Sequence, residues 1–271
     1  MFFKVPNPLS PFIKEIWHWK QVDTESLPWI LPSYEFELVF HLTSPPSIYP
    51  LSGPPIHLPL VHWVGPQNKR WKLVSTEKLN LISIRFHAGS PYELFKESAL
   101  TFLNRFPPLD SATFSAFLKL TSVLSEKESL SAEVIGKFET MVTEILEGYR
   151  KGIKSIDANV NFAFQELTNA KASIEEIAIK TGISRKQLER GMKQVYGFAP
   201  GELRKIHRIL AMIRNPNYYK SENMESRLTD LAYDFGYTDQ SHLIRDFKSV
   251  TGYLPKDWFK NFEKMSYFYN S

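Results

Sequence analysis

The feature that most constrains the fold is a segment that occurs twice in the C-terminal half of the chain. In its second copy, Gly236 is placed at a turn and Asp239 at the start of a helix, where a carboxylate caps free N–H groups. Apolar residues then recur at helical spacing, which predicts one buried face: Leu243, Phe247 and Val250. The opposite face carries Ser241, Arg245 and Lys248. The pattern predicts the turn and second helix of a helix-turn-helix.

The first copy repeats this design with a one-residue difference in the turn. Gly182 precedes Gly236 by 54 residues, whereas Leu188 precedes Leu243 by 55. Its buried face is predicted to hold Leu188, Met192 and Val195, and its outward face Lys186, Arg190 and Lys193. One helix of this kind is usually an ordinary surface helix. Two copies with matched basic fronts favour insertion into DNA major grooves.

The second copy resembles the signature of the AraC-type transcription regulators. The likeness lies in Gly-Tyr-x-Asp-Gln-Ser-His-Leu-x-Arg-x-Phe-Lys from Gly236, and in Gly252-Tyr253-Leu254-Pro255. The first copy is less similar, since Met192 replaces a frequent Phe and Gly191 sits mid-helix at a cost of about 1 kcal/mol relative to Ala. The resemblance covers about Asp157–Trp258. It implies two helix-turn-helix units joined by a long helix, with recognition helices 184–195 and 240–250 in successive major grooves.

The resemblance also implies which residues contact DNA. Base-reading positions of the first unit fall on Lys186, Glu189 and Arg190, since Arg suits guanine and a carboxylate accepts from cytosine. In the second unit they fall on Gln240, Ser241, His242 and Arg245. Other side chains within reach of DNA are Arg185, Gln187, Lys193 and Lys248. Double-stranded DNA is thus the expected partner, and RNA polymerase is implied by the family.

Composition excludes several function classes. The chain has no cysteine, which rules out disulfides, a thiol nucleophile, Cys-ligated zinc and the Cys-dependent alkyl transfer of some AraC-type proteins. No long uncharged apolar window or signal peptide is found, so we expect a cytoplasmic protein. Residues 1–150 hold 14 Lys and Arg against 15 Asp and Glu, and residues 151–271 hold 19 against 14. The basic excess in the half with the repeat fits a polyanion partner.

The N-terminal half is rich in proline and aromatic residues and predicts short strands. Strands are expected at Glu35–Leu42, His62–Val64, Trp71–Val74 and Leu79–Phe86, separated by Pro- and Gly-rich turns. They predict a small barrel or sandwich. Three segments resemble the cupin-like domain often fused in front of AraC-type modules: Leu31-Pro32, Val64-Gly65-Pro66-Gln67, and Ile84-Arg85-Phe86-x-x-Gly89 followed by Pro107-Pro108-Leu109. This resemblance implies a domain that senses an effector or mediates oligomerisation.

The N-terminal half gives little indication of a catalytic or metal-binding site. Four histidines, His41, His57, His62 and His87, lack the His-x-His pattern of cupin metal sites, so we expect no metal and no cofactor. Glu35 and Glu37 share a strand face, which we interpret as solvated rather than as paired catalytic acids. We expect no enzymatic activity. Whether an effector pocket draws on some of the tryptophans is left open: Trp17, Trp19, Trp63 and Trp71.

The expected domains are a β domain at 1–112, a helical connector at 113–153 and the DNA-binding domain at 154–271. The connector predicts two amphipathic helices whose apolar stripe is covered within the chain or by a homodimer partner. Residues 215–227 are an insertion relative to the family, which puts the spacing of the two recognition helices in doubt. A C-terminal amphipathic segment after Pro255 is expected to pack against the β domain.

Together these features predict an α+β protein that regulates transcription by binding specific DNA sequences. Two alternatives remain at this level. The first is an N-terminal enzyme or small-molecule binder whose helical half binds protein, and the second is charge-driven binding of any nucleic acid. The sequence leaves open the operator, the effector, the oligomeric state and whether the outcome is activation or repression.

Overall fold

The computed structural model describes residues 2–3, 5, 9–21, 27–109, 132–150, 152–169, 173–214 and 224–260. The N-terminal half is built mainly from strands and two short helices: β1 (Phe2–Phe3), β2 (Ile13–Gln21), β3 (Trp29–Ile30), β4 (Phe36–His41), β5 (Ser47–Tyr49), β6 (Ile56–His57), β7 (Val61–Val64), β8 (Trp71–Val74), β9 (Leu79–Phe86), α1 (Ser90–Phe95) and α2 (Ala99–Phe102). Helices form the rest: α4 (Ala132–Arg150), α5 (Ala158–Asn169), α6 (Ile174–Thr181), α7 (Arg185–Tyr196), α8 (Pro200–Arg214), α9 (Met224–Asp234), α10 (Gln240–Thr251) and α11 (Pro255–Lys260). The α+β class is therefore confirmed.

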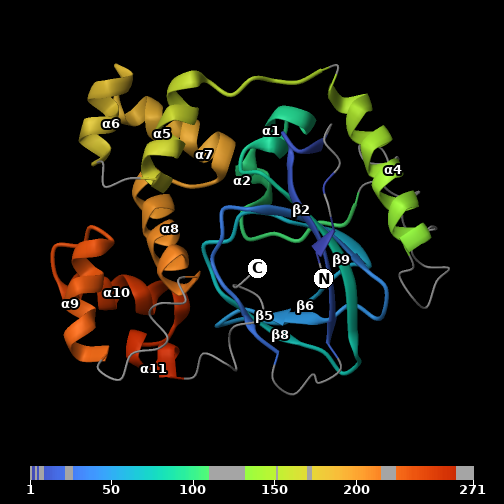
Figure 1. Ribbon diagram of the computed structural model, residues 1–271, viewed down its shortest axis with the longest axis horizontal. Coiled ribbons are helices and arrows are strands. Elements are labelled where there is room, and N and C mark those ends of the chain that lie inside the picture. Colours follow the sequence, from blue (N-terminus) through green and yellow to red (C-terminus); the bar gives the residue numbers. More distant parts are fainter. Residues whose placement is uncertain are drawn as a thin grey trace.

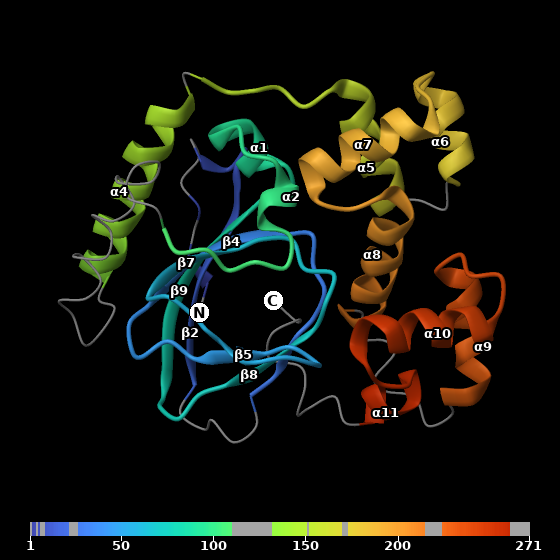
Figure 2. The ribbon, with the colours of Figure 1, turned by 180° about the vertical axis from the view of Figure 1, so that it is seen from behind.

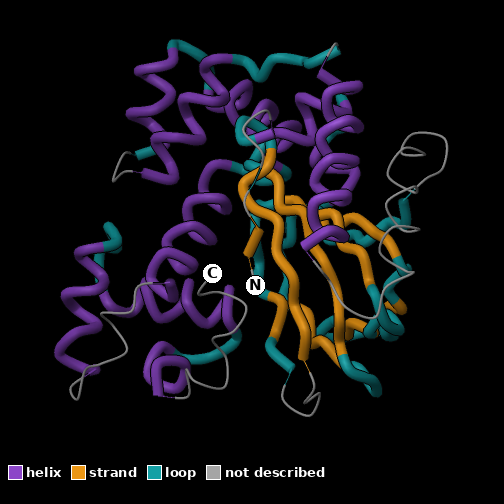
Figure 3. Tube along the Cα trace, turned by 45° about the vertical axis from the view of Figure 1, so that its right-hand side comes forward, coloured by secondary structure: helices purple, strands orange, loops and turns teal. Residues whose placement is uncertain are grey.

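The strands form two antiparallel sheets that face each other as a small barrel (Figure 1). One sheet has the order β1-β2-β9-β4-β7 and the other β3-β8-β5-β6. Strand β9 is central to the larger sheet, with Ile84 opposite both Ile16 of β2 and Leu38 of β4. The strands gather on one side of the molecule with helices around them (Figure 3).

Helices cover the outer face of the larger sheet. The apolar stripe of α4 packs on this face through Val134, Phe138, Val142 and Leu146, with the ring of Phe138 5.7 Å from that of Phe40. The apolar stripe of α4 is thus covered by the β domain of the same chain, which is one of the two expectations for the connector. The first expected connector helix lies outside the described residues. Because one sheet face meets helices and the other faces the barrel interior, neither is solvated.

The barrel interior contains a charged cluster, so the interpretation of Glu35 and Glu37 as a solvated strand face is wrong. Glu35 is 9% exposed and Arg85 is 4% exposed. Arg85 forms ion pairs with Glu37 at 2.9 Å, with Glu35 at 3.4 Å and with Glu15. Burial by itself raises the pKa of Glu35, but the charges of Arg85, Lys14 and Arg214 outweigh it and hold the pKa below its usual value. The neighbouring positive charges thus keep the Glu35 carboxylate ionised inside the fold.

The helical half is arranged along α8, which runs between a group of helices near the barrel top and a group below (Figures 1 and 2). Helices α5, α7 and α10 all contact α8. Residues 215–223 lie outside the described residues, and so does the tail after Lys260. The described part of the C-terminal segment, α11, packs on α10, with the rings of Phe247 and Trp258 6.2 Å apart.

The barrel and the helical half share a contact surface. Helix α2 packs against α7, and Ser98 of the α2 cap donates a hydrogen bond to the carbonyl of Gln194. Further along, the Tyr34 hydroxyl lies 3.0 Å from Nδ1 of His207 on α8. A Cβ added at Gly197 would come within 3.0 Å of Pro66, so glycine allows this close approach and also the left-handed turn that ends α7 at φ 83°.

Candidate DNA-binding surface

The first recognition helix, α7, is defined by the caps and turn that precede it. Helix α6 begins with a capping box in which Ser173 and Glu176 satisfy each other's backbone N–H groups. Gly182 ends α6 at φ 66°, a left-handed conformation that glycine adopts without a Cβ penalty. Ser184 then caps α7, and the Gln187 side chain accepts from the Ser184 backbone at 3.0 Å. The helix starts one residue later than the predicted 184, because Ser184 is the cap.

The predicted DNA-contact residues of α7, except Arg185, line one shallow depression on its outer face together with the cap residue Ser184. Its lining is Ser184, Lys186, Gln187, Glu189, Arg190 and Lys193. The opposite face is fully buried through Leu188 and Met192, both 0% exposed. This division of the helix into a packed back and a polar front follows the predicted register.

Two ion pairs within the chain already involve predicted DNA contacts of α7. Glu189 accepts a hydrogen bond from Lys193 at 2.7 Å. This bond and the positive charge of Lys193 hold the pKa of the Glu189 carboxyl below its usual value. Arg185 lies 3.3 Å from Glu175 of α6, with 70% of its side chain exposed. Since both pairs are solvent-exposed, their stabilisation is small and they can exchange for phosphate contacts.

The second recognition helix, α10, repeats the plan with a different cap. Asp239 accepts from the backbone N–H of His242 at 2.7 Å, and Gly236 takes φ 68° in the turn. Leu243 and Phe247 are 0% exposed, as the spacing predicts. The outward residues are exposed: Ser241, Arg245 and Lys248.

Gln240 and His242 are only partly exposed, unlike the other predicted contacts of this helix. The His242 ring packs edge-on against Tyr237, with centroids 5.1 Å apart. Its two nitrogens lie 3.3 Å from Thr238 Oγ1 and 3.6 Å from Asp246. The structure thus places His242 among contacts of its own unit, whereas Ser241 and Arg245 face outward.

Helix α8 fixes the second unit through a contact that the sequence reading did not identify. The guanidinium of Arg208 lies 5.1 Å from the ring centre of Tyr237, in a cation–π contact. Tyr237 is 3% exposed, and its burial raises the pKa of the phenol. A side chain at Gly236 would meet Arg208, since an added Cβ lies 3.0 Å from the guanidinium. The Gly-Tyr pair of the signature therefore also serves as the docking point for α8.

The glycine in the middle of α7 also has a structural reason. A Cβ at Gly191 would lie 2.4 Å from Cγ2 of Val160 on α5. Glycine therefore allows α5 and α7 to pack closely, and this offsets the helix-propensity cost that the sequence indicates.

A cavity between the two sheets is lined by two of the four candidate tryptophans, Trp17 and Trp19. Trp63 instead packs among the residues beneath the helices, and Trp71 packs in a separate cluster, where it donates to the Gln67 side chain at 2.8 Å. Within the described ranges no group of three metal-ligating side chains comes together. None of the described helices combines the length and apolar character that a membrane crossing requires.

Comparisons with known proteins match two segments of the chain. Residues 177–261 match the family model described as a helix-turn-helix domain. Residues 2–108 match a domain of unknown function, DUF6597. No curated protein is similar enough in sequence to count as a match.

The fold is similar to that of ToxT from Vibrio cholerae. One crystal form of ToxT aligns with a TM-score of 0.50 and 13% identity, covering 93% of this chain and 100% of ToxT. A structure of wild-type ToxT with a bound unsaturated fatty acid aligns with a TM-score of 0.45 and 14% identity, over 90% of this chain and 93% of ToxT. The match over residues 177–261, together with the two helix-turn-helix units of the structure, shows a DNA-binding transcription regulator with an AraC-type helix-turn-helix domain at its C-terminus.

Proposed function

We propose that the protein regulates transcription by placing α7 and α10 in successive major grooves of one operator. The observation that carries this proposal is the repeated division of each helix into a buried apolar back and an exposed basic front. Helix α8 contacts both recognition helices and so holds them as one reader. The fifteen residues of α8 span about 22 Å. The widths of α7 and α10 and their side chains add to this length and bring the separation of the two recognition surfaces closer to the 34–36 Å of one DNA turn.

The outward side chains divide into two roles in this proposal. Lys186, Arg190 and Arg245 read base edges, since guanidinium groups pair with guanine in the major groove. Lys193 and Lys248 hold phosphates, together with Arg185, and set the register without reading sequence. The further contacts of this proposal come from Gln187, Glu189, Gln240, Ser241 and His242.

The N-terminal domain, proposed at 1–112, acts in this scheme as a sensor without enzymatic activity. Two observations support this sensor role. A cavity lies between the two sheets, and the domain contacts the helical half where α2 packs on α7 and Tyr34 packs on α8. A small-molecule effector would shift the populations of DNA-competent arrangements through these contacts. The connector at 113–153 and the DNA-binding domain at 154–271 complete the division. Two further partners are proposed: a second copy of this chain bound to the same DNA, and RNA polymerase. The cytoplasm is the expected location.

The test is selection of bound sequences from a random duplex pool, followed by binding measurements on the selected site. Arg190→Ala and Arg245→Ala are expected to cost about 1–3 kcal/mol each and to relax base preference at one position each. Lys248→Ala should weaken binding to all sequences alike and lower the salt dependence by about one phosphate contact.

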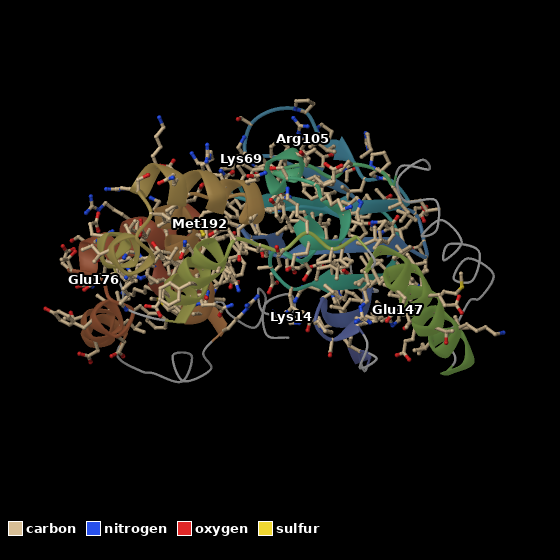
Figure 4. The ribbon with its side chains drawn as sticks, turned by 90° about the horizontal axis from the view of Figure 1, so that it is seen from above. Lys14, Lys69, Arg105, Glu147, Glu176 and Met192 are labelled. Atoms are coloured by element: carbon tan, nitrogen blue, oxygen red, sulfur yellow. The ribbon has the colours of Figure 1, made fainter. Side chains whose placement is uncertain are left out.

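Arg105→Ala is the matched control, because Arg105 is an exposed arginine on the barrel half, away from the helical half that carries Glu176 (Figure 4). It should leave binding unchanged. Equal losses on random and selected DNA for all variants would leave only charge-driven binding. Absence of DNA binding at low salt would contradict the proposal and favour a small-molecule binder with a protein-interaction half.

A further inference from the structure

The barrel interior holds a cavity that DNA binding does not explain. It lies between the two sheets and has a volume of about 80 Å³. Its wall is mostly aromatic and aliphatic, and includes Trp17, Trp19, Val39, Leu73, Leu81 and Phe106. Predominantly apolar walls with a few polar groups are the usual composition of a small-molecule site.

His41 is a polar group in this wall that has no hydrogen-bond partner. The residue is 6% exposed, and neither Nδ1 nor Nε2 is hydrogen-bonded in the described structure. Its ring stacks on that of His62, with centroids 5.2 Å apart and planes 14° apart. His62 in turn donates from Nδ1 to the Pro59 carbonyl at 3.0 Å, which fixes its tautomer. Burying an imidazole with both nitrogens unsatisfied costs free energy, and a bound ligand would recover it.

The cavity offers no free charge to a ligand. Burial lowers the pKa of His41 to about 3 and that of His62 to about 4, so both rings are neutral at pH 7. Glu37 also lines the cavity, but one of its oxygens accepts from Arg85 and the other from Ser83. A charged ligand would lose its hydration without gaining an ionic partner, and this favours an uncharged one.

We propose that this cavity binds a small uncharged aromatic molecule whose hydroxyl or amide group hydrogen-bonds to His41. A neutral imidazole has one donor and one acceptor nitrogen, which matches a group that both donates and accepts. The volume is about half of the roughly 150 Å³ apolar cavity that accommodates benzene. The volume thus limits the ligand to at most a single ring, and the side chains that line the cavity move outward to admit it.

This inference rests on the proposed function only in that the ligand would be the signal that the regulator senses. A route to the DNA-binding half is present, because Glu37 also lines a second cavity together with Arg214 of α8. Between them, Arg85 pairs with both Glu37 and Glu35, and Glu35 lies 3.9 Å from Arg214. A ligand that moves Glu37 would thus be felt at the linker helix.

The experiment is calorimetric titration of the full chain with phenol and, separately, with toluene, which has a similar shape but no hydroxyl. Phenol is expected to bind about tenfold more tightly, as one buried hydrogen bond allows. His41→Phe keeps a ring but removes both nitrogens, so the phenol preference should disappear. His41→Gln restores a donor and an acceptor and should recover part of the preference. His57→Phe, at an exposed histidine outside the cavity, should leave the tenfold ratio unchanged.

Equal affinities for phenol and toluene, no binding of phenol, or an unchanged ratio in His41→Phe would each overturn the proposal. Circular dichroism of each variant identifies any that does not fold, and indole NMR signals of Trp17 and Trp19 give a second readout in the native chain. DNA selection without phenol distinguishes the two proposals. Selective DNA binding with no phenol binding removes only the ligand proposal, whereas His41-dependent phenol binding without DNA binding removes only the proposed operator reading.

Discussion

The two helix-turn-helix units share a sequence plan but are held in place by different parts of the molecule. Helix α7 packs against α2 of the barrel as well as against α5 and α8. Helix α10 packs against α8, α9 and α11, all of which belong to the helical half. The caps differ as well, with a reciprocal Ser184–Gln187 box on α7 and a single Asp239 carboxylate on α10.

This difference indicates how the halves communicate. A change in the barrel reaches α7 by direct contact, through α2 and the close approach of Pro66 to Gly197. It reaches α10 through α8, where Arg208 stacks on Tyr237, and at the end of α10, where the Arg70 guanidinium of the barrel lies against Gly252. The first unit is thus the one whose recognition helix packs on a helix of the N-terminal domain, and substitutions at equivalent positions should have unequal effects on the two units.

The largest expected effect comes from the buried leucines at equivalent positions. Leu188→Ala and Leu243→Ala each remove a fully buried side chain and should lower the free energy of unfolding by about 3–5 kcal/mol. Hydrogen exchange should show that Leu188→Ala also loosens α2, whereas Leu243→Ala leaves α2 protected. Leu254→Ala, at an exposed leucine, serves as the control. Unchanged protection of α2 in Leu188→Ala would mean that the barrel does not brace the first unit.

A smaller effect is expected where the units differ in helix packing. Gly191→Ala places a Cβ against the stiff side chain of Val160, and should destabilise by about 1–3 kcal/mol despite the better helix propensity of Ala. The equivalent residue of α10 is Asp246, which lies 3.6 Å from His242, and Asp246→Ala should cost less, about 0.2–1 kcal/mol. Urea unfolding measures both. Val160→Ala in the Gly191→Ala background should recover part of the loss, and stabilisation by Gly191→Ala alone would disprove the close packing of α5 and α7.

The smallest effect is expected at the caps. Ser184→Ala and Asp239→Ala should each cost about 1 kcal/mol, because a backbone N–H group loses its acceptor in both. Ser184→Ala also removes the hydroxyl that donates to Gln187 at 2.7 Å, so the first turn of α7 should fray more than that of α10. Amide exchange in the two first turns checks this. Equal fraying would show that the reciprocal box adds nothing beyond a single cap.

The local plan of the helical half was predictable from the sequence. Helical periodicity and the cap residues identified both units, their buried leucines and the outward face of each helix, because these depend on neighbours within a few residues. Strand β9 was predicted for the same reason, since alternation reports which side chains share a face. The sequence did not reveal that His242 packs on Tyr237, or that Gly191 accommodates Val160, because the partners come from another element or another turn.

The sequence by itself thus determined the helices of the two helix-turn-helix units, their duplication and the basic fronts of α7 and α10. Only the tertiary structure decided which of the remaining surfaces are buried. Glu35 and Glu37 lie on a strand face that looks solvated in the sequence, yet Arg85 neutralises them inside the barrel. The physical reason is that residue spacing fixes which side chains share a face, whereas the cover of that face comes from segments far away along the chain.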